Sequence, residues 1–259
     1  MPSTLWNLSK NPASSFFDLR FTRILFGQEF LKWLAIVSMT VDHVSEHLLS
    51  GYQPGRAFGR LAFPLFAMFV AYNYTRFYQG RFPDRYLSRL LLFGLLAQAA
   101  YITFGLERIN IMATLSLGLL TLYFHANGKY VWLVILSVGI ALFNHFVYSI
   151  EYGLPGVLLV LFLTFQKRLL ILLPALFIIA TPATGLQNLP VIPLILPTAF
   201  YSKAHTLLFE TAFALAIVLA ATAYTRMCPS AGRSKHKYFF YAFYPAHLSI
   251  ILAMEWYLS

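Results

Sequence analysis

Charge is scarce in this sequence, and acidic charge most of all. Charged residues make up 11% of the 259 positions, with nine carboxylates against 19 lysines and arginines, whereas soluble domains carry about 25% charged residues. Hydrophobic residues fill 59% of the chain. This composition argues against a soluble globular domain. It predicts helices in lipid, because a segment in the bilayer must satisfy its own backbone hydrogen bonds.

Cysteine and the common catalytic motifs are also missing. The single cysteine, Cys228, excludes an intrachain disulfide and a cysteine metal cluster. The sequence contains no phosphate-binding glycine loop, no HExxH and no GxSxG. We therefore expect no metal and no soluble cofactor fold. The N-terminal region also lacks the compact apolar core of a cleavable signal peptide.

Apolar runs recur along the chain with the length of membrane helices, about 20 residues for a hydrocarbon core of about 30 Å. Residues 1–28 are expected to be a cytoplasmic or interfacial segment, and residues 29–259 a single transmembrane domain. The predicted fold is an all-α, polytopic helix bundle. Its expected segments are 30–49, 57–75, 87–105, 111–126, 130–148, 153–166, 169–181, 187–201, 205–225 and 238–257.

Basic residues cluster in the connectors, which explains the net charge of +10 without a nucleic-acid partner. One cluster contains Arg76, Arg81, Arg85 and Arg89, and another contains Arg226, Arg233, Lys235 and Lys237. The positive-inside tendency predicts that both face the cytoplasm. Seven segments separate them, and an odd number of spans cannot return to the same side. We therefore expect nine full spans plus one broken segment at 187–201, with ten spans as the alternative.

The first apolar segment carries an unusual set of ionisable residues, which are costly in lipid and indicate a functional site. They are Lys32, Asp42, His43, Glu46 and His47. Asp42 and Glu46 are spaced i, i+4, as are His43 and His47, so each pair shares a helix face. A nearby carboxylate supports a histidine base. Glu46 can accept from His43, while Asp42 can instead contact another helix.

Two further segments place polar groups beside proline. Arg60 precedes Pro64 by four residues, so we expect Pro64 to leave the Arg60 carbonyl without its helical donor. Arg60 is interpreted as an anion ligand or a partner of Asp42 or Glu46. In the last segment, Tyr244 and His247 lie one turn apart, next to Pro245. Glu151 and His145 are isolated in the sequence and carry no interpretation alone. Together these residues suit a membrane transferase or a proton-coupled carrier.

Six stretches of the chain resemble the TraX family, membrane proteins of F-type conjugation systems that N-acetylate pilin. They are LKWLAIVSMTVDH (31–43), GRLAFPLFAM (59–68), LLFGLLAQAAY (91–101), RINIMATLSLGLL (108–120), EYGLPGVLLVL (151–161) and FFYAFYPAHL (239–248). The family is similar to wider transmembrane acyltransferases, which have a basic residue, usually arginine, followed by a histidine after ten intervening residues. Here ten residues separate Lys32 from His43.

The resemblance implies a multi-pass protein of the bacterial inner membrane. It implies acetyl-CoA as donor, a pilin subunit as acceptor, and His43 as the acid and base, with Asp42 beside it. Arg60, Lys32 or Asn110 can supply donors to an oxyanion, and His43 can instead carry the acetyl group covalently. Arg76, Arg85 and Arg89 are candidate contacts for the phosphates of acetyl-CoA.

Two other functions remain open at this stage. One keeps the acetyl donor but changes the acceptor to a hydroxyl of an envelope glycan. The other is a non-enzymatic carrier or pilus-assembly factor that uses the same polar cluster for protons or docking.

Overall fold

A computed structural model describes residues 27–50, 52–164, 215–220, 222–223 and 237–258 of the protein. These residues are helical and contain no named strand, which confirms the predicted all-α class. The helices with defined bounds are α2 (Gln28–His47), α3 (Gln53–Gly59), α4 (Ala62–Phe77), α5 (Asp84–Thr103), α6 (Ile111–Ala126), α7 (Tyr130–Phe146), α8 (Gly153–Phe162) and α12 (Lys237–Leu258).

The helices match most of the predicted apolar segments, with one correction. The segment expected at 57–75 is divided into α3 and α4, and the chain turns at Arg60 and Leu61. Pro64 therefore lies in the first turn of α4, where an α-helix needs no backbone donor, and not inside a continuous helix. The segments at 169–181 and 187–201 and most of 205–225 lie outside the described residues, so the number of spans stays a prediction.

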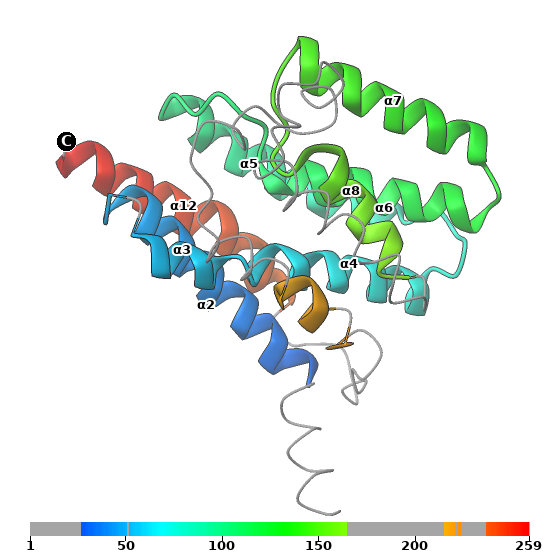
Figure 1. The fold of residues 1–259 in the computed structure, drawn as a ribbon, viewed down its shortest axis with the longest axis horizontal. Coiled ribbons are helices and arrows are strands. Elements are labelled where there is room, and N and C mark those ends of the chain that lie inside the picture. Colours follow the sequence, from blue (N-terminus) through cyan, green and yellow to red (C-terminus); the bar gives the residue numbers. More distant parts are fainter. Residues whose placement is uncertain (1–26, 51, 165–214, 221, 224–236, 259) are drawn as a thin grey trace, which may run out of the picture.

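α4 lies at the centre of the bundle (Figure 1). It packs against α2, α6 and α8, and α12 packs against α2 and α5. Residues along α4, including Phe63, Leu65, Met68 and Val70, are almost completely inaccessible to solvent. A polar group that enters this interior must find its partners on neighbouring helices, because water does not reach it.

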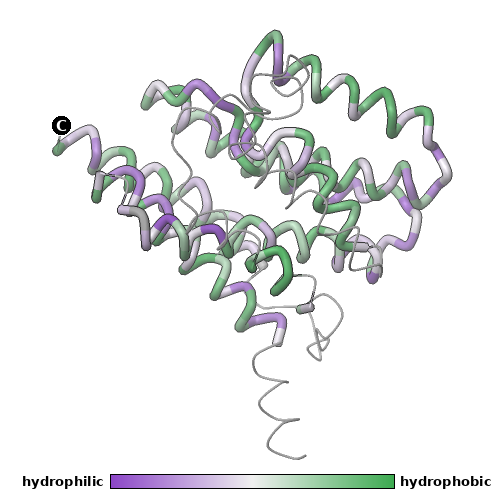
Figure 2. Tube along the Cα trace, viewed as in Figure 1, coloured by the Kyte–Doolittle hydropathy of each residue, from purple (hydrophilic) through white to green (hydrophobic). Residues whose placement is uncertain are grey.

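α5 and α7 present apolar surfaces to the outside. α5 is the one helix in the described residues that is both long and apolar enough to cross a membrane, and α6, α7 and α8 are apolar but shorter. α7 is hydrophobic along most of its length (Figure 2). Its residues Val131, Val134 and Phe146 are all more than half exposed. An exposed apolar surface of this kind marks a site of contact with lipid or with another protein.

The two ends of the bundle are tied by different contacts. At one end, the connector before α6 pairs with the connector before α8 through an isolated parallel bridge between Ile109 and Ile150. At the other end, the Asn127 side chain donates to the Gly80 carbonyl, 2.8 Å away, so the α6–α7 and α4–α5 connectors meet. The 16-residue helix α4 runs between the two ends, a rise of about 24 Å.

Candidate functional site

The C-terminal part of α2 carries two polar stripes that face different helices. Asp42 and Glu46 face α3, and His43 and His47 face α12, as the contacts below show. The stripes are separated because residues one position apart on a helix point about 100° apart. The predicted contact between Glu46 and His43 is therefore replaced by partners on α3 and α12.

His43 and His247 form the centre of this site. The Nδ1 atom of His43 lies 2.9 Å from Nε2 of His247, and the two ring planes are nearly parallel, 5° apart, with centroids 5.1 Å apart. Nδ1 of His247 lies 2.8 Å from the Phe243 carbonyl oxygen. His247 is buried, and the ring of Tyr244 lies 6.5 Å from that of His43. The structure thus brings His43 of the first predicted segment together with Tyr244 and His247 of the last.

When both rings are neutral, this chain of contacts fixes the positions of their protons. A carbonyl oxygen can only accept, so Nδ1 of His247 carries the hydrogen and donates it to Phe243. Nε2 of His247 is then the acceptor, and His43 must donate from Nδ1. The lone pair of His43 is left on Nε2. That atom is a base oriented by the rest of the chain.

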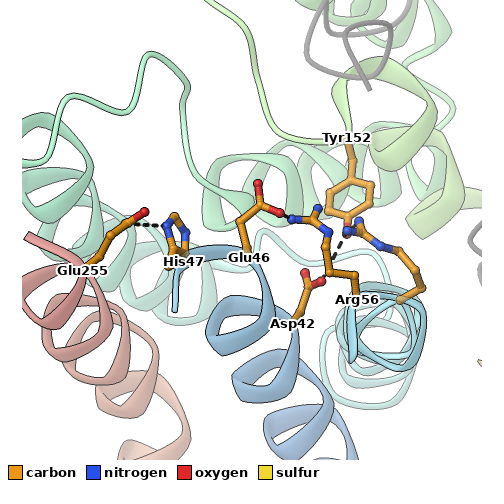
Figure 3. A network of polar contacts seen from close by, with 7 residues as sticks. Asp42, Glu46, His47, Arg56, Tyr152 and Glu255 are labelled. Carbon is orange, nitrogen blue, oxygen red and sulfur yellow. Dashed lines mark hydrogen bonds and ion pairs between the residues drawn. The ribbon is translucent and has the colours of Figure 1, made fainter. Parts of the chain in front are cut away.

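His47 and Glu255 form a second contact between α2 and α12. Nδ1 of His47 lies 2.7 Å from a carboxylate oxygen of Glu255 (Figure 3). The His47 side chain is only 7% exposed, whereas that of Glu255 is 43% exposed. This contact leads from the buried histidines toward the surface at the end of α12.

Asp42 and Arg60 pair across α2 and the end of α3. An Arg60 guanidinium nitrogen lies 3.4 Å from Asp42, and its second terminal nitrogen donates to the Tyr152 hydroxyl at 3.1 Å. Arg60 was predicted to be either an anion ligand or a partner of Asp42 or Glu46, and the structure shows it paired with Asp42. Gly59 permits this approach, because a Cβ there would lie 2.2 Å from the Asp42 Cβ.

Glu46 pairs with Arg56 one turn away from the Asp42 contact (Figure 3). The sequence analysis missed Arg56. Its signal was available, because Arg56 and Arg60 have the same i, i+4 spacing as Asp42 and Glu46. Two carboxylates one turn apart on α2 therefore face two guanidiniums, one on α3 and one on its C-terminal capping residue.

A second group of polar residues approaches from the paired connectors. The Tyr101 hydroxyl donates to Glu151 at 3.3 Å, and the Arg108 guanidinium lies over the Tyr101 ring, 6.0 Å from its centroid. Tyr152 has a left-handed backbone with φ of 61°, and its ring stacks on Phe63 at 3.9 Å. Glu151 appeared isolated in the sequence, but the bridge between Ile109 and Ile150 sets its connector beside the one that carries Arg108.

We call this assembly the polar centre. It consists of Asp42, His43, Glu46, His47, Arg56, Arg60, Tyr101, Arg108, Glu151, Tyr152, Tyr244, His247 and Glu255. Within the described residues, no three His, Cys, Asp or Glu side chains converge as a metal-binding group. The polar centre therefore offers histidines with fixed proton positions and pairs of opposite charges.

Two predicted supporting residues lie outside the polar centre. Lys32 pairs with Glu29 at 3.1 Å and is about 16 Å from His43 along the helix axis. The Asn110 side chain caps α6 by accepting from Met112. Its amide donates to Gly94 at 2.8 Å and to Gln98 at 2.9 Å. Both amide hydrogens are thus used within the protein, and the geometry favours a structural role for Asn110.

The predicted donor-binding arginines lie at the opposite end of the bundle. Arg76 and Arg85 are exposed near the α4–α5 connector. Arg89 lies one turn further along α5, with its guanidinium 5.8 Å from the centroid of the Tyr238 ring. The length of α4 separates these arginines from the polar centre.

Comparison with known proteins identifies the family. Residues 27–255 match the family described as TraX protein. The chain belongs to the TraX family.

Two relatives match part of the TraX chain. An uncharacterised protein of Rickettsia prowazekii (strain Madrid E) is 31% identical over 104 residues, which cover 39% of this chain and 38% of the relative. A probable fimbrial assembly protein FimC, serogroup H1, of Dichelobacter nodosus is 34% identical over 114 residues, which cover 38% of this chain and 46% of the relative. The matches thus span less than half of either relative. No solved structure matches this TraX protein.

Proposed function

We propose that this TraX protein is a membrane-embedded acetyltransferase that moves an acetyl group from acetyl-CoA to the N-terminal amine of a conjugative pilin. The observation that carries the proposal is the hydrogen-bonded chain from His43 through His247 to the Phe243 carbonyl. It leaves Nε2 of His43 as an oriented base within the polar centre. Family membership supports the acetyl donor and the pilin acceptor.

Acetyl transfer to an amine needs a base and a stabilised oxyanion. As the amine nitrogen attacks the thioester carbonyl, Nε2 of His43 takes the amine proton, and the carbonyl electron pair moves to oxygen. When the C–S bond breaks, the CoA thiolate leaves and takes the proton from His43. The products are an amide and a thiol. His247 supports the positive charge that His43 carries between these steps.

Asp42 contributes through its partners and not through His43. Its carboxylate pairs with Arg60, which also holds the Tyr152 hydroxyl. We expect Asp42 to position this side of the polar centre, and its replacement by Asn to weaken the Arg60 contact. Arg76, Arg85 and Arg89 are proposed to hold the CoA phosphates at the cytoplasmic end, as point charges or bidentate donors.

The test is the fraction of pilin that carries an N-terminal acetyl group, measured by intact mass in cells with and without the protein. Replacing His43 by Ala should lower the rate by about 10²–10⁴ for a general base, and abolish it for a covalent acetyl carrier. The matched control is His145→Ala, because His145 is exposed and contacts Phe146 away from the polar centre. Full acetylation by the His43 variant would refute the proposed base.

A second candidate function is a non-enzymatic role in pilus assembly, which the name of the Dichelobacter nodosus relative favours. An assay of purified protein with acetyl-CoA and pilin tests the enzyme directly, and transfer of acetyl to pilin supports it. In cells that lack the protein, loss of pili when pilin was never acetylated supports the assembly factor. Acetylation of an envelope glycan without acetylation of pilin supports transfer to a glycan hydroxyl.

A further inference from the structure

The polar centre contains three arginines, and one of them is held differently from the others. Arg56 pairs with Glu46, and Arg60 pairs with Asp42. Arg108 makes no carboxylate contact or guanidinium hydrogen bond to any described residue, and its Nε is buried without a partner. A buried N–H without an acceptor costs free energy, so this guanidinium is suited to a ligand that brings an oxygen atom.

The backbone around Arg108 is firmly fixed. The Ile109 amide donates to Ser149 at 2.8 Å, and the Glu151 amide donates back to the Ile109 carbonyl at 2.9 Å. The Gln98 side chain donates to the Arg108 carbonyl at 3.0 Å. Fixed donors stabilise a developing charge without the cost of reorganisation.

The Arg108 side chain is directed by its neighbours. The ring of Tyr101 lies beneath the guanidinium at 6.0 Å, and a cation over an aromatic face is attracted by the ring quadrupole. The bridge between Ile109 and Ile150 sets the Arg108 connector beside the connector of Tyr152, whose hydroxyl accepts from Arg60, the partner of Asp42 next to His43. A fixed cation and an oriented base are thus found in one polar centre.

We propose that Arg108 binds the carbonyl oxygen of the acyl thioester and stabilises the oxyanion of the tetrahedral intermediate, an inference that rests on the proposed acetyl transfer. When the amine attacks, the C–N bond forms and the carbonyl electron pair moves to the oxygen beside Arg108. His43 holds the amine proton. When the pair returns, the C–S bond breaks and the thiolate leaves with that proton.

The first test compares Arg108→Gln and Arg108→Lys with Glu107→Gln, an exposed control in the same connector. Arg108→Gln should lower kcat by about 10²–10³-fold, the effect of removing an oxyanion donor, and leave KM almost unchanged. Arg108→Lys should recover part of the rate, because lysine keeps the charge but not the fork. Glu107→Gln should match wild type. A higher KM at unchanged kcat would overturn the proposal.

The second test uses a donor in which sulfur replaces the thioester carbonyl oxygen, since sulfur is a weaker hydrogen-bond acceptor. The wild-type protein should react faster with the oxygen donor than with the sulfur donor. The ratio of these two rates should be at least ~10-fold smaller in Arg108→Gln, which corresponds to the loss of one hydrogen bond. A merely structural role would lower both rates and leave the ratio unchanged, which would overturn the proposal. Failure of the proposed function is separate, because the wild-type protein would then transfer no acetyl group from either donor.

Discussion

Nδ1 of His43 lies 2.9 Å from Nε2 of His247, although 204 positions separate the two residues in the chain. The contact joins the first described helix to the last. It matters chemically because the second ring nitrogen of His247 is occupied by the Phe243 carbonyl. The proton order of the pair is thereby fixed, and the lone pair of His43 is presented on Nε2.

The first prediction concerns His247 as a positioning residue. His247→Leu removes the acceptor for Nδ1 of His43, so the imidazole loses its fixed tautomer, and acetyl transfer should fall by about 10²-fold or more. His247→Gln should recover activity, because an amide oxygen can accept in place of Nε2. The measurement is the pH profile of kcat, which should change in His247→Leu. An unchanged profile in both variants would mean that His247 only fills space.

The second prediction concerns the close approach of α3 to α2. Gly59→Ala places a methyl group 2.2 Å from the Asp42 Cβ, and overpacking of this kind costs about 1–3 kcal/mol. The variant should have a lower thermal midpoint in detergent and lower acetyl transfer, because Asp42 moves away from Arg60. Gly139→Ala is the matched control. Its Cβ would meet nothing within 4 Å, so its midpoint should stay or rise.

The third prediction concerns the partly buried pair of Glu46 and Arg56. Glu46→Gln removes the carboxylate that pairs with Arg56, and the cost should lie between about 0–1 kcal/mol for a surface pair and about 3–5 kcal/mol for a fully buried one. Replacing both residues by methionine should cost less than the sum of the single replacements. A double-mutant cycle of unfolding free energies measures this coupling. Additive effects would show that the pair contributes no interaction energy.

The fourth prediction concerns the donor-binding arginines. Replacing Arg85 and Arg89 together by Gln should raise the acetyl-CoA concentration needed for half-maximal rate and leave the maximal rate largely intact. The reason is that both lie at the end of the bundle opposite to the polar centre. Steady-state kinetics at equal protein abundance tests this. Unchanged donor dependence would reduce the two residues to topology signals.

The fifth prediction concerns the membrane sides of the two ends. Arg81 and Glu107 are exposed before and after α5. In a Cys228→Ser background, Arg81→Cys should be protected from an impermeant thiol reagent in intact spheroplasts, and Glu107→Cys should react. The basic residues around Arg81 predict the cytoplasmic side for that end. Reaction of both cysteines from outside would refute this orientation.

Local patterns account for what the sequence predicted well. The apolar runs predicted the helices with bounds close to those observed, and 111–126 was predicted with the bounds of α6. The i, i+4 spacing of Asp42 with Glu46 predicted a common face, which the structure confirms through Arg60 and Arg56. Periodicity is a property of neighbouring residues, so a single segment is enough to reveal it.

Partners across the bundle were decided by tertiary packing alone. The sequence indicated that His43 and His247 are candidates, but only the packing of α12 against α2 shows that they touch. No sequence pattern paired Arg108 with Glu151, because only the bridge between Ile109 and Ile150 sets their connectors side by side. By itself, the sequence determined an all-α chain with a polar cluster on its first described helix. Which polar group meets which depends on contacts between residues distant in sequence, and helical periodicity carries no information about them.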